Sequence, residues 1–283
     1  MRTGSLLSGN ELTSIHSLSR SYSLLNMSAL RLSTLKRINR AADDPAALIA
    51  AETLNSELTA VQAANANAAR AVGTIHVADS GMAEVGNLLN SIRGNVMEAA
   101  GGFLSDAEME AKQIEINAAV EAVNRISSYT SYGGRKLLDG SAENLVLNFS
   151  PSPDDTSTLS LPNVHATSLG GDSGSLSELT TGGSLSLASG NFSGMIDTLD
   201  AARDQVLYAR AEAGAFEKYS IESSMRVLDE MEETLTAGIS RLMDTDVAQE
   251  ASNMLRAQIL VASGIAMVGT STQSRGLIGQ LLA

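Results

Sequence analysis

The rest of the predicted fold is organised around the stretch VAQEASNMLRAQILVASGIAMVGTSTQSRGLIGQLLA, Val247 to Ala283. On a helix, one apolar stripe advances by alternating four- and three-residue steps and is interrupted by Gln258: Val247, Ala251, Met254, Val261, Ile265 and Val268. A second stripe lies beside it and contains Leu255, Ile259, Ala262 and Ala266. The apolar face is wider than a helix with a single partner needs, so the pattern predicts neighbours on several sides.

No charged residue occurs in this stretch between Arg256 and Arg275, which raises the question of a membrane span. Such a span needs about 20 predominantly apolar residues. Gln258, Ser263 and the polar run 270–274 interrupt the apolar sequence. The interruptions favour burial against other protein, and we predict no membrane span.

The composition is typical of long helices. Aromatic residues make up 3% of the 283 residues, and the chain has four prolines and no tryptophan. No cysteine is present, which excludes disulfides and thiolate metal sites. His16, His76 and His165 show no ligand or catalytic-triad spacing, so we expect no metal, no cofactor and no enzyme activity. Residues 1–12 contain no apolar run of signal-peptide length, so we expect no cleaved secretory signal.

The charge is distributed unevenly along the chain. Residues 1–40 carry a net charge of +5 and residues 247–283 carry +1. Residues 41–246 carry −19, which brings the net charge of the whole chain to −13. We therefore expect both ends to pack inside an assembly and the acidic middle to face water. The basic residues near the amino terminus are dispersed, and Tyr22 is the one aromatic residue among them, which argues against nucleic-acid binding.

Near the amino terminus a heptad seam predicts a helix that ends in a short connector. Its positions follow 3-4-3-4-3 steps: Ile15, Leu18, Tyr22, Leu25, Ala29 and Leu32. Asp44 followed by Pro45 predicts an N-cap and the start of a second helix, and residues 39–43 then form the connector. The second helix carries heptad tracks from Leu54 to Ala99, with Asn65 as a polar member.

The pair Gly101-Gly102 predicts a helix end, and Ser105 with Glu108 matches a capping box that starts a third, antiparallel helix. The tripeptide Tyr132-Gly133-Gly134 is a turn signal. After it, alternation predicts a half-buried strand at Leu145, Leu147 and Phe149. Residues 150–192 are rich in Ser, Thr, Gly and Asp and predict exposed loops with a β-hairpin or two.

A helical period returns from Gly194, with a register slip between Phe216 and Leu228. The whole pattern predicts a mainly α fold, a long antiparallel helical bundle or coiled-coil rod built from both chain ends, with a small central β-hairpin region. The predicted segments are an amino-terminal core helix and connector (1–44), outer-rod helices (45–140), an exposed loop and β region (141–193), a returning rod helix (194–243) and a carboxy-terminal core helix (244–283).

Three stretches resemble bacterial flagellin. The sequence LSTLKRINRAADDPAALIAAETLNSEL (Leu32–Leu58) is similar to the family's amino-terminal segment. RISSYTSYGGRKLLDGS (Arg125–Ser141) resembles its passage from third helix to hairpin, and DTDVAQEASNMLRAQILVASGIAMVGTSTQSRGLIGQLL (Asp244–Leu282) resembles its carboxy terminus. The resemblance covers about residues 1–140 and 194–283. Leu35 and Pro45 depart from it, since the family usually has a glycine and a small residue there, which affects the connector but not the seams.

The resemblance implies a structural subunit, not an enzyme, that is exported through the flagellar type III route and polymerises in the extracellular filament. Terminal helices from many subunits would form the inner tube. The implied inter-subunit packing residues are Ile15, Leu18, Tyr22, Leu25, Leu32, Met254, Ile259, Val261, Ile265 and Val268. The connector and helix cap comprise Asn39, Asp43, Asp44 and Pro45. Implied partners are further copies of the chain, an export chaperone, the filament cap and junction proteins.

Many flagellins are also recognised by an innate immune receptor through a patch on the second helix. The matching positions here are Asn90, Arg93 and Glu115. Ser91, Gly94 and Asn95 stand where the family usually has larger or charged residues, so the resemblance implies weak recognition at best.

Two alternatives to a filament subunit follow from the same sequence. A hook–filament junction protein shares the terminal pattern, although such proteins usually match less well at the carboxy terminus. A membrane-inserting translocator of a type III secretion system is a different class, and residues 257–274 are its candidate membrane segment.

Overall fold

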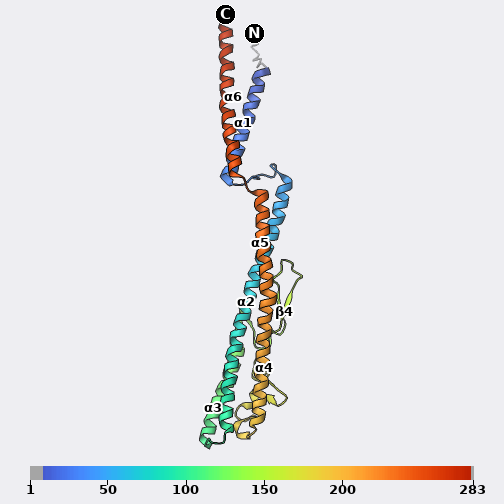
Figure 1. Cartoon of the computed structure of the whole chain (residues 1–283), viewed down its shortest axis with the longest axis vertical. Helices are drawn as coiled ribbons and strands as arrows, with labels where there is room; N and C mark the ends of the chain where they lie inside the picture. The colour runs from blue at the N-terminus through green and yellow to red at the C-terminus, as the bar shows by residue number, and fades with distance from the viewer. Residues whose placement is uncertain (1–8, 282–283) are drawn as a thin grey trace. The chain divides into compact units, whose positions relative to one another are not determined.

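The computed structural model describes residues 9–281, so the first eight residues of the expected signal-free segment 1–12 and of the predicted segment 1–44 lie outside the described part. The chain divides into two compact units. The first is formed by the two chain ends, residues up to 58 and from 233 onward, and the second by residues 59–232. Figure 1 labels the helices, which make the fold mainly α, as predicted.

In the first unit, helix α1 (Gly9–Thr34) lies side by side with helix α6 (Val247–Leu281) (Figure 1). The two helices run antiparallel, because Gly264 lies against Leu18 near one end of the pair and Glu250 contacts Arg31 near the other. The predicted pairing of the two chain ends is therefore confirmed. The unit also holds the beginning of helix α2 (Pro45–Ala100) and the end of helix α5 (Glu222–Met243).

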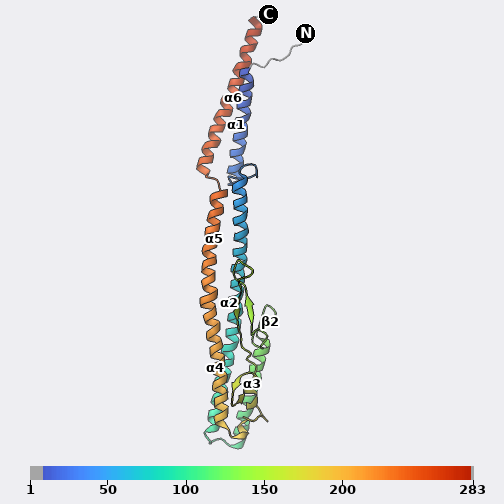
Figure 2. The same cartoon turned by 90° about the vertical axis from the view of Figure 1, so that its right-hand side faces the viewer.

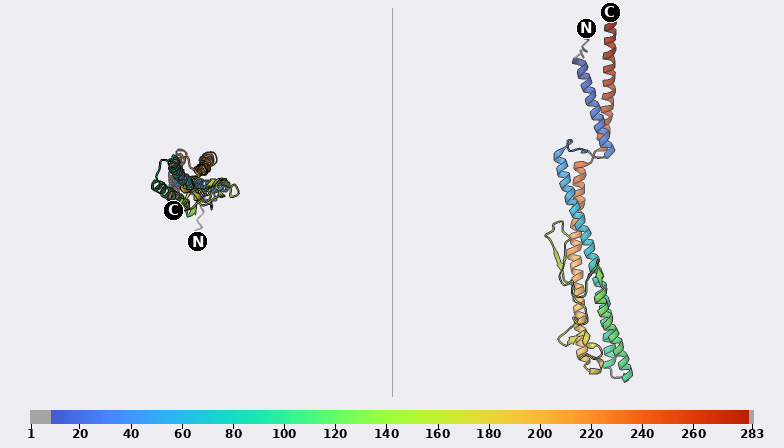
Figure 3. Two further views of the ribbon diagram at one scale, coloured as in Figure 1. Left: turned by 90° about the horizontal axis from the view of Figure 1, so that it is seen from below. Right: turned by 180° about the vertical axis from the view of Figure 1, so that it is seen from behind.

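In the second unit, helices α2, α3 (Asp106–Tyr129) and α4 (Phe192–Phe216) pack around an elongated apolar core (Figure 2). On α2 the fully buried side chains recur at steps of three and four, as a heptad period requires: Ala78, Met82, Val85, Leu89, Ile92, Val96 and Ala99. Ile116, Val120 and Val123 of α3 complete the core from one side, and Leu199 and Val206 of α4 from another. The α2–α3 turn lies at one end of this unit (Figure 3).

Helix α4 continues into α5 through one turn of π-helix, η3 (Glu217–Ile221). A π turn contains an extra residue relative to an α turn, so it rotates the buried stripe by one position. Ala213 is buried before the turn, Ile221 is buried at its last position, and Leu228 is buried after it. The register slip predicted between Phe216 and Leu228 therefore has a local cause in this turn.

Three short antiparallel strand pairs lie between α3 and α4. They are β1 (Ser131–Tyr132) with β2 (Arg135–Lys136), β3 (Leu145–Leu147) with β4 (Ser157–Leu159), and β5 (Gly170–Gly171) with β6 (Gly174–Ser175). The β1–β2 turn uses Gly133 and Gly134 at φ values of 58° and 81°, which a two-residue hairpin turn of this type requires. Leu145 and Phe149 are buried and Val146 faces outward, as predicted, but the strand ends at Leu147, and Leu147 and Asn148 are both half-buried, so the alternation does not continue through Phe149.

The prediction that residues 141–193 are exposed is wrong for most of their large apolar side chains. Buried residues of this segment include Leu159, Leu161, Val164, Leu169, Leu176, Leu179, Leu185 and Leu187. Two short 3-10 helices, η1 (Leu176–Leu179) and η2 (Leu187–Ser189), hold some of them against the helices. The buried amide of Gln113 secures the segment, because it donates to the Leu179 carbonyl and accepts from the Leu187 N–H, both at 2.8 Å.

The predicted capping box at the start of α3 is confirmed. The Ser105 hydroxyl accepts from the Glu108 N–H at 3.4 Å, and the Glu108 carboxylate accepts from the Ser105 N–H at 2.7 Å. The backbone N–H and then the hydroxyl of Ser105 lower the pKa of Glu108 below its ordinary 4.5. A lowered pKa stabilises the fold above the unfolded-state value, and this contribution is lost as the pH falls through the folded-state value.

Ser105→Ala is expected to lower the free energy of unfolding by about 1 kcal/mol, because the hydroxyl satisfies an otherwise unpaired N–H at the helix start. Chemical denaturation followed by circular dichroism measures the change. Ser91→Ala is the matched control, since that exposed serine lies within α2, away from the helix start, and its hydroxyl donates to the Asn87 carbonyl. Equal losses in the two variants would contradict the assignment of the cap.

Candidate assembly interface

The α1–α6 contact uses a narrow seam with small residues at its closest points. Buried and half-buried positions of α1 recur at heptad steps: Ser14, Leu18, Ser21, Leu25, Ser28 and Leu32. Those of α6 do the same: Glu250, Met254, Ala257, Val261, Gly264 and Val268. A Cβ on Gly264 would stand 3.0 Å from Leu18 Cδ1, so the helices approach closely there. Serine, alanine and glycine make this approach possible and leave larger side chains outside the seam.

The structure divides the predicted packing residues between two surfaces. Residues in the seam within the chain are Leu18, Leu25, Leu32, Met254, Val261 and Val268. Ile15 and Tyr22 of α1 and Ile259 and Ile265 of α6 lie outside it and are exposed, Ile259 to 66%. A large part of each of these four side chains is left in contact with solvent by the packing within one chain. Their role between subunits stays a prediction.

Further large apolar side chains are exposed on the same two helices, and the heptad analysis missed most of them. On α1 they are Leu12, Leu24, Met27 and Leu30; on α6 they are Val247, Leu255, Leu260 and Met267. The exposed residues of α1 lie outside the predicted heptad seam. They would have been recognised only by counting the apolar residues on every face of the helix. An exposed apolar surface of this extent marks an interaction surface.

An ion pair crosses the seam. Arg31 of α1 lies 3.8 Å from Glu250 of α6, and their side chains are 25% and 9% exposed. Within residues 9–281, the buried Nε of Arg31 has no hydrogen-bond partner. A charged pair in an apolar seam disfavours any other alignment of the two helices, because a shift would strand a buried charge. The sequence did not reveal this pair, since the residues are far apart in the chain.

The connector between α1 and α2 is held by its own acidic side chains. Asp43 accepts from the N–H groups of Asn39 and Arg40 at 3.0 and 2.9 Å, and these bonds lower the pKa of Asp43 below its ordinary 3.8. The Asn39 amide donates to the Lys36 carbonyl at 2.8 Å. Asp44 accepts from the Ala47 N–H at 3.0 Å, at the start of α2 on Pro45. The four predicted connector residues thus lie together, and none of these contacts involves catalytic chemistry.

Residues 35–37, which lie between α1 and the connector, are joined to the α5–α6 junction by backbone hydrogen bonds. The Arg37 N–H donates to the Met243 carbonyl at 2.6 Å, and the Thr245 N–H donates to the Leu35 carbonyl at 3.0 Å. The Arg37 guanidinium also donates to the Leu242 carbonyl near the α5 carboxyl end. Leu35 adopts a φ of 57°, a left-handed conformation that is costly for a residue with a Cβ. The backbone hydrogen bonds of Leu35 and Arg37 to the α5–α6 junction hold Leu35 in this conformation.

Leu35→Gly is expected to raise the free energy of unfolding by up to about 1.5 kcal/mol. Removing the Cβ relieves roughly 1–2 kcal/mol of left-handed strain, of which roughly 0.5–1 kcal/mol is offset by the greater freedom of glycine in the unfolded chain. Leu30→Gly is the control, since this exposed leucine lies within α1, where glycine costs about 1 kcal/mol. A loss of stability in Leu35→Gly would contradict the strain at this position.

The predicted receptor-patch residues lie in the second unit, and two of them form ion pairs within the chain. Arg93 of α2 pairs with Asp200 of α4. Glu115 lies 3.4 Å from Lys112, which also contacts Glu98 at 2.8 Å, and the bond to Glu98 is the main cause of a raised Lys112 pKa. Asn90 is exposed on α2.

One helical stretch of the described residues, Val247–Thr270, is long and apolar enough to cross a membrane by length and composition alone. Most of this stretch is unburied within the chain, as the exposures of Leu255, Ile259 and Met267 illustrate. The same property is expected of a helix whose apolar sides are covered by neighbouring molecules.

Residues 9–143 match the bacterial flagellin N-terminal helical region, and residues 196–278 match the bacterial flagellin C-terminal helical region. A flagellin of Bacillus subtilis is 27% identical, and the match covers 96% of this chain and 97% of that protein. A flagellin of Treponema pallidum is 28% identical over 86% of this chain and 88% of its own length. A solved flagellar hook-associated protein of Vibrio parahaemolyticus shares the fold, with a TM-score of 0.62 at 16% identity, over 71% of this chain and all of that one.

Proposed function

Because this chain belongs to the bacterial flagellin family, we infer that it is a structural subunit that polymerises into the flagellar filament. We propose that helices α1 and α6 of many copies pack against one another to form the inner tube. The observation that carries this assignment is the exposed apolar surface on both helices, which remains after their serine-containing seam is closed.

Two physical arguments support this role for the helix pair. Apolar surface gains roughly 25 cal/mol per Å² when it leaves water, so exposed isoleucine and leucine side chains favour association. The exposed side chains of α1 and α6 differ in sequence and lie on different helices, so contacts between unlike faces of successive copies are available. Such head-to-tail contacts generate a helical filament when the rotation does not close a ring.

We propose further that the chain is exported through the flagellar type III route and acts outside the cell. An export chaperone, the filament cap and junction proteins are the partners that this route implies. The unpaired apolar faces of α1 and α6 support the need for a chaperone, because they would otherwise associate before export.

Electron microscopy of the purified full-length chain, seeded with filament fragments, tests the proposed function. Long uniform filaments that contain this chain throughout their length are the expected result. Failure to elongate seeds at any concentration would contradict it. Deletion of the gene from its host and observation of filament loss provides the corresponding test in cells.

A hook–filament junction role is the main alternative, and the fold shared with the Vibrio parahaemolyticus hook-associated protein favours it at the level of architecture. A junction protein would be present in few copies near the filament base. Immunogold labelling with an antibody against this chain distinguishes the two roles, since a filament subunit is labelled along the whole filament.

A membrane-inserting translocator is the alternative from another class, and the apolar length of Val247–Thr270 is the observation in its favour. Release of a trapped dye from anionic lipid vesicles by the purified chain would support it. We expect no release above that caused by Ile259→Asp, a variant whose charge lies in the candidate membrane segment.

We expect weak recognition by the innate immune receptor. Arg93 and Glu115 are each paired within the chain, so a receptor must compete with Asp200 and Lys112 for them. A receptor reporter assay with purified monomer is expected to show a response well below that of a strongly recognised flagellin. Asp200→Ala frees Arg93 and is expected to increase the response, and a full-strength response to the unmodified chain would contradict this expectation.

A further inference from the structure

A single aromatic side chain projects from the end of the second unit. Phe103 lies in the turn between α2 and α3 and is 96% exposed. Gly102 turns the chain at a φ of 72°, and the capping box at Ser105 fixes the following residues. Leu104 packs against the core from the same turn. Phe103 is therefore held outward by an ordered turn and is not the consequence of a loose loop.

The sequence around Phe103 suits burial against another surface. Residues 101–105, GGFLS, carry no charge, and the glycines present no side chain beside the ring. None of these five residues is charged, and the carboxylate of Glu108 already accepts hydrogen bonds from the N–H and hydroxyl of Ser105. Burial of a phenylalanine side chain removes roughly 150–250 Å² of surface from solvent. Covering Phe103 in a contact between copies would therefore contribute favourably to the free energy of association.

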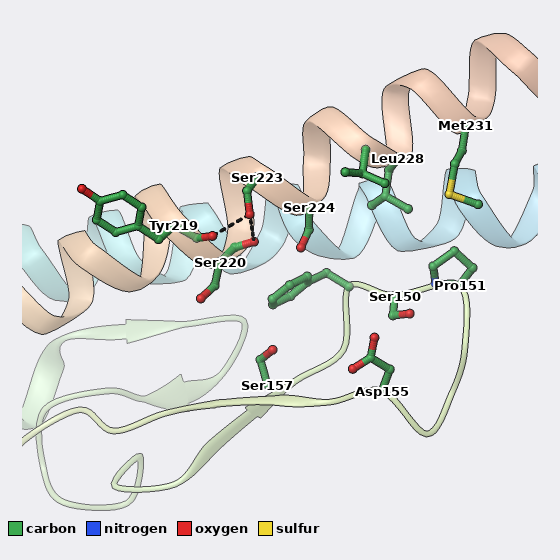
Figure 4. A pocket seen from close by; sticks show the side chains of 12 residues that line it. Ser150, Pro151, Asp155, Ser157, Tyr219, Ser220, Ser223, Ser224, Leu228 and Met231 are labelled. Carbon is green, nitrogen blue, oxygen red and sulfur yellow. Dashed lines mark hydrogen bonds between the residues drawn. The ribbon is translucent and has the colours of Figure 1, made fainter.

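The same unit contains a groove into which an aromatic ring fits. The hairpin groove lies between the β3–β4 segment and the first turns of α5, and it has a volume of about 580 Å³ (Figure 4). Its apolar lining includes Phe149, Pro151, Val227, Leu228 and Met231. The π turn η3 forms one end of the groove through Tyr219 and Ser220. Single π turns within α-helices occur frequently at functional sites.

The lining of the hairpin groove combines apolar side chains with serines and one carboxylate, so it suits an uncharged occupant better than an anionic one. Phe149 already makes an edge-to-face contact with Phe216, at 6.3 Å between ring centroids, and it gives the groove an aromatic wall. Met231 places a thioether at the other end, and sulfur contacts aromatic rings favourably. The Ser223 hydroxyl donates to the Tyr219 carbonyl at 2.5 Å, so an apolar occupant would not leave this hydroxyl unpaired. Asp155 is the one charged residue of the lining.

Phe103 cannot reach the hairpin groove of its own chain. Hydrogen bonds from Asn65 to Asp229 and between His76 and Glu217 place the groove beside residues 65–76 of α2. At 1.5 Å per helical residue, the groove therefore lies roughly 40–55 Å from the α2–α3 turn along the helix axis. A second copy that is displaced along this axis by that distance brings its Phe103 to the level of the groove. The contact joins unlike surfaces, so each added copy exposes a new groove and a new Phe103.

We propose that Phe103 of one copy inserts into the hairpin groove of the next copy along the filament. The inference rests on the proposed function, because only a polymer of this chain presents the two surfaces to each other repeatedly. It assigns the second unit a specific contact between copies, in addition to the one proposed for α1 and α6.

The absence of cysteine from the chain allows a direct test. The double variant Phe103→Cys with Val227→Cys is assembled, oxidised as filaments and separated under denaturing, non-reducing conditions. A ladder of dimers, trimers and longer species is expected, because each copy is linked to two others. The matched control combines Phe103→Cys with Tyr208→Cys, since Tyr208 is 77% exposed on α4 and lies outside the groove. The control is expected to give no ladder.

Truncation of the side chain provides an independent measurement. Phe103→Ala is expected to raise the critical concentration for assembly on the order of tenfold to hundredfold. Phe103→Leu keeps a large apolar side chain, so its critical concentration should stay close to that of the unmodified chain. Thermal unfolding of the monomer should not change, because the ring contacts solvent. Ser224→Trp, which fills the groove, should raise the critical concentration similarly, and combining it with Phe103→Ala should add little.

The outcomes separate this contact from the proposed function. Filaments of the double-cysteine variant without a ladder, or equal ladders in the variant and its control, would overturn the contact and leave the filament role intact. A normal critical concentration for Phe103→Ala would also overturn it. Failure of the unmodified chain to form filaments would overturn the filament role and this contact together.

Discussion

Ile259→Asp is expected to abolish filament formation at concentrations where the unmodified chain assembles, while the single chain folds normally. Ile259 lies on the surface of α6 that faces away from α1 and is 66% exposed. Surface substitutions of this kind usually change the free energy of unfolding by less than about 0.5 kcal/mol. The change therefore acts on contacts between copies and spares those within one copy.

The size of the expected effect follows from burial in the assembly. Covering an isoleucine side chain contributes roughly 1.5–3 kcal/mol, and each 1.4 kcal/mol corresponds to about a tenfold change in affinity. Loss of burial alone raises the critical concentration about tenfold to hundredfold, and an unpaired carboxylate in an apolar contact adds a further penalty. Sedimentation of filaments over a concentration series measures the critical concentration, and circular dichroism checks the fold.

Val146→Asp is the matched control for this variant. It introduces the same charge in place of another branched aliphatic residue of similar exposure, on the outward side of β3 in the second unit. Filament formation should persist in the control. Normal assembly of Ile259→Asp would remove the central argument for packing of α6 between subunits.

Arg31→Met alone is expected to loosen the α1–α6 pair, and Arg31→Met combined with Glu250→Leu is expected to restore it. Removing one member of a mostly buried ion pair leaves an uncompensated charge, which costs about 3–5 kcal/mol when burial is complete. Replacing both members with apolar residues of similar size is often neutral or stabilising. Partial exposure of Arg31 reduces the expected cost of the single change to about 2 kcal/mol.

Amide hydrogen exchange of α1 and α6 in the monomer measures this effect directly. The single variant should exchange faster across both helices, and filament assembly should weaken with it. The double variant should recover protection in α1 and α6. Continued fast exchange in the double variant would show that Arg31 stabilises the pair through packing of its side chain and that the ion pair with Glu250 contributes little.

The helical segments could be located from sequence because local chemistry specifies where they begin and end. Asp44 and Pro45 mark the beginning of α2, Ser105 and Glu108 cap α3, and Gly133-Gly134 forms the β1–β2 turn, all as predicted. Each signal depends on residues a few positions apart. The same is true of the period-two pattern at 145–149, which needs no distant partner to be recognised.

The buried leucines of residues 141–193 could not be recognised in the same way. They lie among Ser, Thr, Gly and Asp without a helical or strand period, so composition alone indicated an exposed loop. Their burial depends on the surface that α2, α3 and α4 offer, and on the Gln113 amide that binds two backbone groups of the segment. The hairpin groove also arises from this packing, which is why no motif indicated it.

Hydrophobic period and residue counts are properties of the chain alone, and they were enough to identify long amphipathic helices whose terminal members carry apolar residues on several faces. Which of these faces is used within one copy depends on how the helices pack. Two neighbouring heptad tracks on α1 have the same period, and the one that contains Ser21 and Ser28 packs on α6 because small side chains allow close approach. Ile15 and Tyr22 are thereby left on the outside. The packing face of α1 is therefore set by side-chain volume at the contact, which the hydrophobic period does not reveal.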